Sequence, residues 1–165
     1  WVRDTEYNTL WHKTGDVFED SFRFVLPGYC VRPLELSAAV GKVQLEKWPE
    51  QYKGRLENAK TFCRVMKGKS VVVPEYTEQS TWFGFPVLCK SGIARRDLLY
   101  RCKQAGIESR PIVSGNFVNQ PVTRKLNHRV SGRLTNAECI DKTGLFFGNH
   151  SIDLSEQINR LGELV

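Results

Sequence analysis

Apolar and small side chains run almost all the way round the stretch from Leu34 to Leu45, a pattern typical of a helix that is buried on most faces. Pro33 and Glu35 suit its first turn, by backbone geometry and by charge. Such a helix needs a large surface to pack against. We therefore expect its apolar surface to be exposed, or covered by self-association, when this chain stands alone.

A second helix is predicted from Pro49 to Gly68. Trp48 precedes a proline, which disfavours helical backbone and separates the two helices. We expect both helices to pack along the sheet that follows. One face of the second helix is apolar at helical spacing, with Tyr52, Leu56, Ala59, Cys63 and Met66.

Short strands and helices alternate after residue 68. Runs of β-branched and aromatic residues predict strands at 70–73, 81–88, 107–113 and 145–147. Helical patterns lie at 94–105, from 135 onward and from 154 to the end. Gly106 is predicted to end the first of these helices, and the capping-box patterns Thr135-x-x-Glu138 and Asp153-x-x-Glu156 are predicted to begin the other two. The sum is a small α+β domain with a sheet of three or four strands.

The first 27 residues show no sustained period of either kind and close with the turn signal Pro27-Gly28. We predict an irregular arm that packs poorly by itself. The chain opens with Trp1 and not with Met, from which we expect it to be part of something longer.

Composition narrows the class of protein. Hydrophobic residues make up 41% and charged residues 25% of the 165 positions, as in ordinary globular proteins. No apolar run approaches the roughly 20 residues that span a bilayer, so we expect no membrane insertion. The net charge of +6 permits an anionic partner, but the charges are scattered, and a solvated basic surface is the simpler explanation.

Five widely spaced cysteines form no CxxC pair, and the three histidines share no ligand spacing with them. We therefore expect neither a disulfide framework nor a metal site. Free thiols among apolar neighbours indicate a reducing compartment, and we predict a cytoplasmic protein.

Three places offer chemistry. Tyr29 and Arg32 lie in a turn just before a helix start, where backbone amides and the helix dipole favour an anion, although many ordinary helices begin this way. Arg110 lies in a predicted strand and is followed by a polar loop with Asn116 and Gln120, which suits either a ligand site or a turn-rich connection. His150 follows the last strand and suits phosphate binding, or simply lies at the surface.

No Ser/His/Asp triad, acid dyad or phosphate loop is present, and no lysine has a context that marks it as a Schiff-base former. We predict no catalytic residue in this chain. It contributes to a site without completing one.

Taken together, the motifs resemble a known family. The run GYCVRPLELSAAVGKVQLEKW (28–48) resembles the GYN-x-R turn and following helix of the DegT–StrS sugar aminotransferases. The run RLENA (55–59) resembles the family's next helix. Three later runs resemble its RfbH- and ColD-like branch of sugar 3-dehydrases and dehydratases: TWFGFPV (81–87), AGIESRPIVSGNFVNQP (105–121) and RLTNAECIDKTGLFFGNH (133–150).

The resemblance implies the C-terminal small domain of a type I pyridoxal-phosphate-dependent transferase, with a mostly antiparallel sheet. Residues 1–33 would be an arm and active-site loop from the large domain, and residues 34–165 the small domain with its linking helices. The cofactor, pyridoxal 5′-phosphate or pyridoxamine 5′-phosphate, belongs to the large domain, and we expect none on this chain alone. Tyr29 and Arg32 would face the cofactor of a partner subunit in a homodimer. There Cys30 replaces the family's Asn, which weakens that contact.

The resemblance also implies a substrate. It would be a nucleotide-linked keto-deoxy sugar of lipopolysaccharide or O-antigen biosynthesis, contacted by Arg110, Asn116, Gln120 and His150. Dehydrase and aminotransferase stay undecided, because the deciding Lys or His position is not in this sequence.

Two alternatives stay open. A nucleic-acid-binding module would use the basic charge and the aromatic run of Trp82, Phe83 and Phe85, but it lacks an RRM-type signature. A metabolite-binding α+β module without catalysis is the other.

Overall fold

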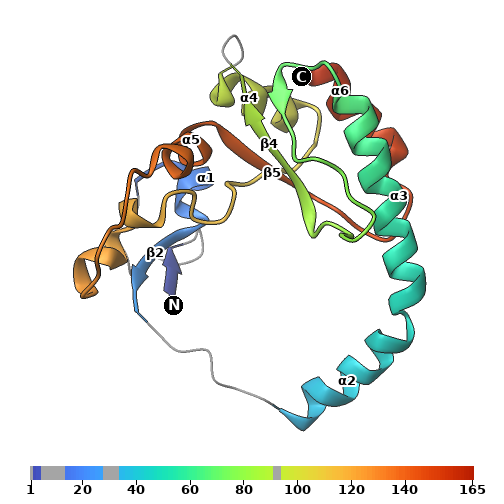
Figure 1. Ribbon diagram of the computed structural model, residues 1–165, viewed down its shortest axis with the longest axis horizontal. Coiled ribbons are helices and arrows are strands. Elements are labelled where there is room, and N and C mark those ends of the chain that lie inside the picture. The colour runs from blue at the N-terminus through green and yellow to red at the C-terminus, as the bar shows by residue number, and fades with distance from the viewer. Residues whose placement is uncertain (1, 5–13, 28–33, 91–93) are drawn as a thin grey trace.

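A computed structural model of the protein describes residues 2–4, 14–27, 34–90 and 94–165. Helices and short strands alternate through most of the chain (Figure 1). In order they are β1 (Val2–Asp4), α1 (Val17–Asp20), β2 (Arg23–Leu26), α2 (Glu35–Glu46), α3 (Trp48–Met66), β3 (Val71–Val72), β4 (Gly84–Cys89), α4 (Arg95–Gln104), the 3-10 helices η1 (Phe117–Asn119) and η2 (Pro121–Lys125), α5 (Thr135–Thr143), β5 (Gly144–Gly148) and α6 (Ser155–Leu164).

The larger sheet has three antiparallel strands in the order β3-β4-β5. Successive side chains along its strands alternate between a buried face and the opposite face, as expected for a sheet with one face covered by helices. Phe85, Val87 and Cys89 of β4 are buried, as are Leu145 and Phe147 of β5, while the residues between them face the opposite side. The α+β prediction and its antiparallel sheet are confirmed.

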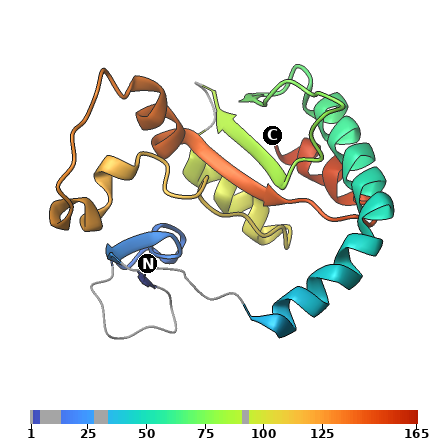
Figure 2. The same ribbon diagram turned by 60° about the horizontal axis from the view of Figure 1, so that its bottom comes forward.

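Helices α3, α4 and α6 cover one face of this sheet, as Figure 2 shows. Their buried residues join the inward side chains of β4 and β5 in one core, centred on Phe62, whose ring stacks on Phe85 at 4.5 Å. Helix α6 packs closely on α3 because Gly162 has no side chain: a Cβ there would lie 2.4 Å from Val65. The contributing helical residues are Ala59, Phe62, Met66, Leu98, Cys102, Ile158 and Leu161.

Two predictions about helix ends have different outcomes. Helix α4 ends as predicted, with Gly106 at φ +71° and the amide of Ile107 donating to the carbonyl of Cys102 at 2.9 Å. The two capping boxes are wrong. Leu134 and Leu154 occupy the N-cap positions without side-chain caps, and Asp153 instead accepts the amide of Ser155 at 2.9 Å.

The strand predicted at 107–113 is reduced to a single bridge. Arg110 and Phe146 exchange two backbone hydrogen bonds, of 3.0 and 2.8 Å, at the free edge of β5. Val113 then adopts φ +46°, which turns the chain away from the sheet. One bridge is nevertheless enough to fix the position of Arg110.

Within the first 27 residues, the described segments 2–4 and 14–27 are more ordered than predicted. β1 and β2 form an antiparallel pair, and Asp16 caps the short helix α1 by accepting the amide of Phe18 at 2.9 Å. Arg95 of α4 ties this segment to the domain, because its guanidinium pairs with Glu19 and lies 5.5 Å from the ring of Phe18. These are tertiary contacts that local periodicity cannot reveal.

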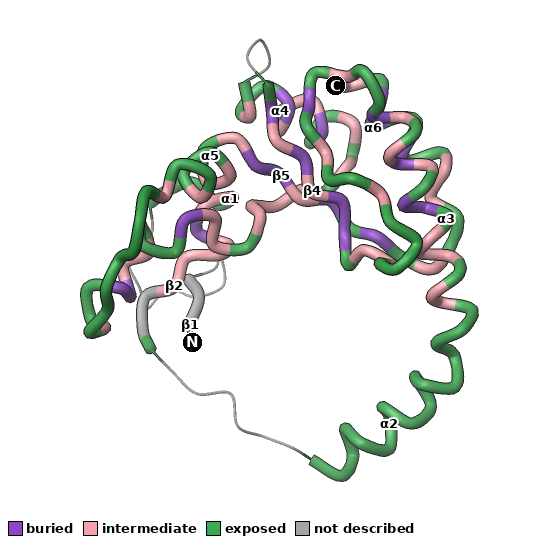
Figure 3. The backbone as a smooth tube through the Cα atoms, viewed as in Figure 1, coloured by how far each residue is buried: buried purple, intermediate pink, exposed green. Residues whose placement is uncertain are grey.

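Only one of the two long helices packs along the sheet. Helix α3 does, but every residue from Leu34 to Glu50 is exposed, so the prediction is wrong for α2 (Figure 3). The expectation of exposed apolar surface is confirmed. Large hydrophobic side chains stand open to solvent along α2 and its flanks: Leu34, Leu36, Val40, Val43, Leu45 and Trp48.

Candidate functional site

Tyr29 and Arg32, the two residues predicted to face a cofactor, lie outside the described residues. The other predicted site residues are described. The structure separates them into two regions.

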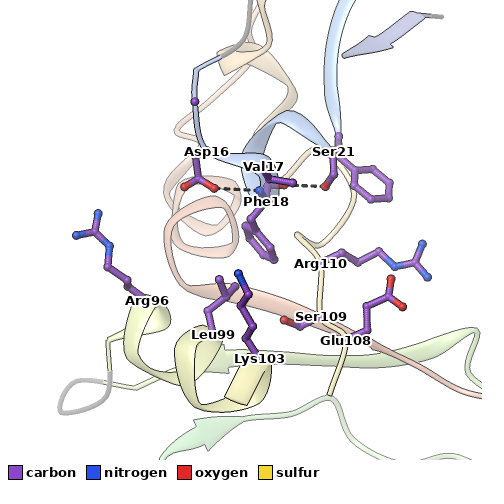
Figure 4. Close-up of a pocket in the computed structure, with 12 residues that line it drawn as sticks. Asp16, Val17, Phe18, Ser21, Arg96, Leu99, Lys103, Glu108, Ser109 and Arg110 are labelled. Atoms are coloured by element: carbon purple, nitrogen blue, oxygen red, sulfur yellow. Dashed lines mark hydrogen bonds between the residues drawn. The ribbon is translucent and has the colours of Figure 1, made fainter. Parts of the chain in front are cut away.

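A cleft of about 800 Å³ lies between α1, the exposed side of α4 and the segment around Arg110. Figure 4 shows side chains from all three entering it. Arg96, Leu99 and Lys103 come from α4, Ser21 and Phe22 follow α1, and Ser109 precedes Arg110. The cleft therefore depends on the packing of the N-terminal segment against the domain.

Arg110 is held by its backbone and by two aromatic rings. The bridge to Phe146 fixes its main chain. Its guanidinium carbon lies 6.0 Å from the ring centre of Phe22 and 5.9 Å from that of Phe146, within the range of a cation–π contact. The side chain is half-buried. A guanidinium positioned in this way keeps its charge and its planar set of donors ready for an anion.

The charges around the cleft favour an anion. Arg96, Lys103 and Arg110 bring three cations. Asp16 and Glu108 bring two carboxylates, but Asp16 accepts the amide of Phe18 as the cap of α1. No nucleophile–base pair is present among the residues that line this cleft. The arrangement can bind and orient a phosphate-bearing ligand but supplies no chemistry of its own.

Asn116 and Gln120 lie in the loop that follows Arg110. The side chain of Gln120 bonds the protein at both ends: its Oε1 accepts the amide of Phe24 at 3.2 Å, and its Nε2 donates to the carbonyl of Ser114 at 3.3 Å. Asn116 is buried, with 4% of its surface exposed. In this structure Gln120 holds β2 against the loop, and its contact with substrate stays a prediction.

His150 lies away from the cleft, beside α3. Its ring is exposed, and Nδ1 accepts the amide of Ile152 at 3.3 Å. The structure therefore brings Arg110 and Gln120 near the same segment, since both lie close to Phe22, but it does not bring His150 to them.

Sequence reasoning missed two buried asparagines. Asn149 donates through Nδ2 to the carbonyls of Arg55, Thr81 and Trp82 at 3.0–3.2 Å. Asn58 donates to the carbonyls of His150 and Ile152 and accepts the amide of Leu154. The runs RLENA and FFGNH thus each place an asparagine in one structural network. Asn149 directly follows the end of β5, which was an available signal, whereas Asn58 lies inside α3, where its position gave none.

The described residues do not by themselves fit a pyridoxal phosphate group. A Schiff-base lysine is normally desolvated or placed beside another cation, and no described lysine is buried. Among the described residues there is also no group of three or more His, Cys, Asp or Glu side chains that could hold a metal ion.

The four described cysteines are free thiols. Burial raises the pKa of Cys102 from its ordinary value of 9.0 to about 11, so this thiol stays neutral and acts as a core residue. In the described part of the chain, none of the helices is both long and apolar enough to cross a membrane.

Comparison with known proteins identifies relatives. The model of the DegT/DnrJ/EryC1/StrS aminotransferase family matches residues 3–164. The GDP-4-keto-6-deoxy-D-mannose 3-dehydratase of Yersinia pseudotuberculosis is 46% identical over 167 residues, which cover 98% of this chain and 42% of the relative.

Solved structures give the same result. The E. coli GDP-4-keto-6-deoxy-D-mannose-3-dehydratase with bound hydrated PLP has a TM-score of 0.76 at 46% identity, and the match covers 92% of this chain and 40% of that one. A mutant GDP-4-keto-6-deoxymannose-3-dehydratase with bound GDP-perosamine matches with the same TM-score at 45% identity and the same coverage. Over the matched residues, the chain has the fold of the corresponding part of these dehydratases.

The chain spans about 40% of the length of the relatives it matches. The family match, in contrast, runs almost from end to end of the chain. The chain therefore belongs to the DegT/DnrJ/EryC1/StrS aminotransferase family.

Proposed function

We propose that this chain is the C-terminal part of a pyridoxal-phosphate-dependent enzyme that removes the 3-hydroxyl group of a GDP-linked 4-keto-6-deoxy sugar. The observation that carries the proposal is the 46% identity to a GDP-4-keto-6-deoxy-D-mannose 3-dehydratase over 98% of the chain. Identity at that level along the whole chain supports a shared substrate as well as a shared fold.

Within that enzyme, residues 1–33 form the end of the large domain with its active-site loop, and residues 34–165 form the small domain. The exposed apolar side chains of α2 support this division, since they offer a surface for a large domain to cover. Pyridoxal phosphate is held by the large domain, and no step through it is assigned to the residues described here.

The role proposed for this chain is to bind and orient the sugar nucleotide. Arg110 meets the diphosphate, because it is the one cation in the cleft that is both half-buried and fixed by its backbone. Arg96 and Lys103 are exposed and add attraction over a longer range. Asn116 and Gln120 shape the loop beside it, and His150 contacts the substrate only if the ligand extends past the end of β5.

The full enzyme is proposed to be a homodimer in the cytoplasm, with Tyr29 and Arg32 facing the partner's cofactor. The free thiols of the described cysteines fit a reducing compartment.

The test is product analysis. The full-length protein is incubated with pyridoxal phosphate, glutamate as amino donor and GDP-4-keto-6-deoxymannose, and the sugar is examined by mass spectrometry and proton NMR. Loss of the 3-hydroxyl with a new methylene at C3 is the expected result. A sugar that keeps its 3-hydroxyl and gains a 4-amino group would make the enzyme an aminotransferase, and an unchanged sugar would contradict the proposal.

A further inference from the structure

An array of rings and one guanidinium crosses the face of the sheet opposite to α3, α4 and α6. The ring of Phe83 stacks on that of Phe146, with centroids 5.8 Å apart and planes at 29°. Arg110 lies 5.9 Å from the same Phe146 ring and 6.0 Å from Phe22, which lines the cationic cleft. Phe146 therefore links the cleft at one end to Phe83 at the other.

The array is built into the fold. Gly84 makes room for it, because a Cβ at that position would lie 2.3 Å from the Phe146 ring. Phe83 ends the array with 76% of its surface exposed. A large aromatic side chain stacked on one side and open on the other is ready to receive a planar group.

The backbone beside Phe83 is strained in a way that sets its direction. Trp82 adopts φ +45°, a conformation unusual for a bulky side chain. It is held there because Asn149 bonds the carbonyls of both Thr81 and Trp82. The Trp82 ring packs against Phe62 and Phe85, while the next residue, Phe83, points outward. Strain that is held by buried hydrogen bonds is typical of functional positions.

We propose that Phe83 stacks on the nucleobase of the sugar nucleotide whose diphosphate meets Arg110. This inference rests on the proposed function and specifies how the same substrate is recognised. The ligand carries a planar base and an anionic diphosphate, and the array offers an exposed ring and a cation on the two sides of one phenylalanine.

A single base fits this surface better than a nucleic-acid strand. Strand-binding proteins present several exposed rings in a row for successive bases. Here Trp82 and Phe85 face the core, and Phe83 alone of the three is exposed. These three residues therefore do not form the row of exposed rings that the nucleic-acid alternative requires.

The test compares two probes on the full-length protein by isothermal titration calorimetry: GDP, which has a base, and inorganic pyrophosphate, which does not. Phe83→Ala should weaken GDP binding about five- to hundredfold and leave pyrophosphate binding unchanged, because stacking on one base is lost. Phe83→Trp should restore GDP binding. Tyr100→Ala is the matched control, since it removes another largely open ring, on α4, that is 64% exposed.

Unchanged GDP affinity in Phe83→Ala would overturn the inference, as would an equal loss for both probes. A change of oligomeric state in sedimentation with GDP binding intact would also overturn it, because Phe83 would then be covered by protein. In each of these three cases, turnover of the sugar nucleotide by the unaltered enzyme leaves the proposed function standing. If the unaltered enzyme neither binds GDP nor turns over the sugar, both proposals fail.

Discussion

Backbone and ring contacts together fix the position of Arg110. Its main chain is fixed by the bridge to Phe146, and its guanidinium is held between two rings. If it meets the diphosphate, Arg110→Ala should raise the KM for the sugar nucleotide about ten- to a hundredfold, as the loss of a charge-assisted contact predicts. Steady-state kinetics on the full-length protein measure this.

Arg160→Ala, on the exposed surface of α6, is the control for general effects of lost charge. Unchanged kinetics in Arg110→Ala, with a large drop in melting temperature, would show that the arginine serves the fold and not the substrate.

Asn149 is the residue whose importance is structural. Its side chain bonds three carbonyls from two separate segments and is 8% exposed. Asn149→Ala leaves those carbonyls without their donor, and we expect a loss of about 2–4 kcal/mol in the free energy of unfolding. Urea denaturation measures it, with the exposed Asn159→Ala as control. A loss no greater than that of the control would show that water replaces the amide at no cost.

At the scale of elements, replacing the glycine of each long helix by alanine should change stability in opposite directions. Gly54 of α3 touches the turn after β5, where a Cβ would lie 2.0 Å from the carbonyl oxygen of Ser151. Gly41 of α2 has nothing within 4 Å of the same position. Gly54→Ala should therefore lower the melting temperature of the chain. Gly41→Ala should stabilise α2 by about 0.5–1 kcal/mol through its helix propensity.

Thermal melting followed by circular dichroism compares the two variants directly. Equal effects would mean that α3 does not approach the turn at Ser151 as closely as the structure shows.

Elements with local signals were predictable. Helix α4 carries its own end signal in Gly106, and β4 and β5 carry β-branched and aromatic runs. The segment around Arg110 was not, because one bridge at a sheet edge gives no period. The sequence predicts the position of helix α2 correctly but its packing wrongly. An apolar pattern shows that a helix surface will be covered, but it does not show which part of the protein covers it.

The residues of the site divide in the same way, into those with a local sequence signal and those that depend on tertiary contacts. Arg110 could be singled out because it lies in a predicted strand and precedes a polar loop. Phe22, Arg96 and Lys103 were missed because they reach the cleft only through tertiary packing between the N-terminal segment and α4.

At the scale of the whole molecule, this chain should not hold pyridoxal phosphate by itself as an aldimine, because no described lysine is buried. The chain mixed with the cofactor should show no absorbance band above about 400 nm beyond that of a simple amine such as free lysine. Borohydride treatment followed by peptide mass spectrometry is the check. A pyridoxyl group trapped on one specific lysine of this chain would contradict the account.

As proposed above, residues 34–165 are the substrate-side small domain of a larger nucleotide-sugar enzyme. The decisive measurement is a crystal structure of the full-length protein with GDP bound. We predict that the GDP diphosphate lies within hydrogen-bond distance of the Arg110 guanidinium and that the apolar side of α2 is covered by the large domain. A diphosphate bound away from Arg110, with α2 still open to solvent, would contradict it.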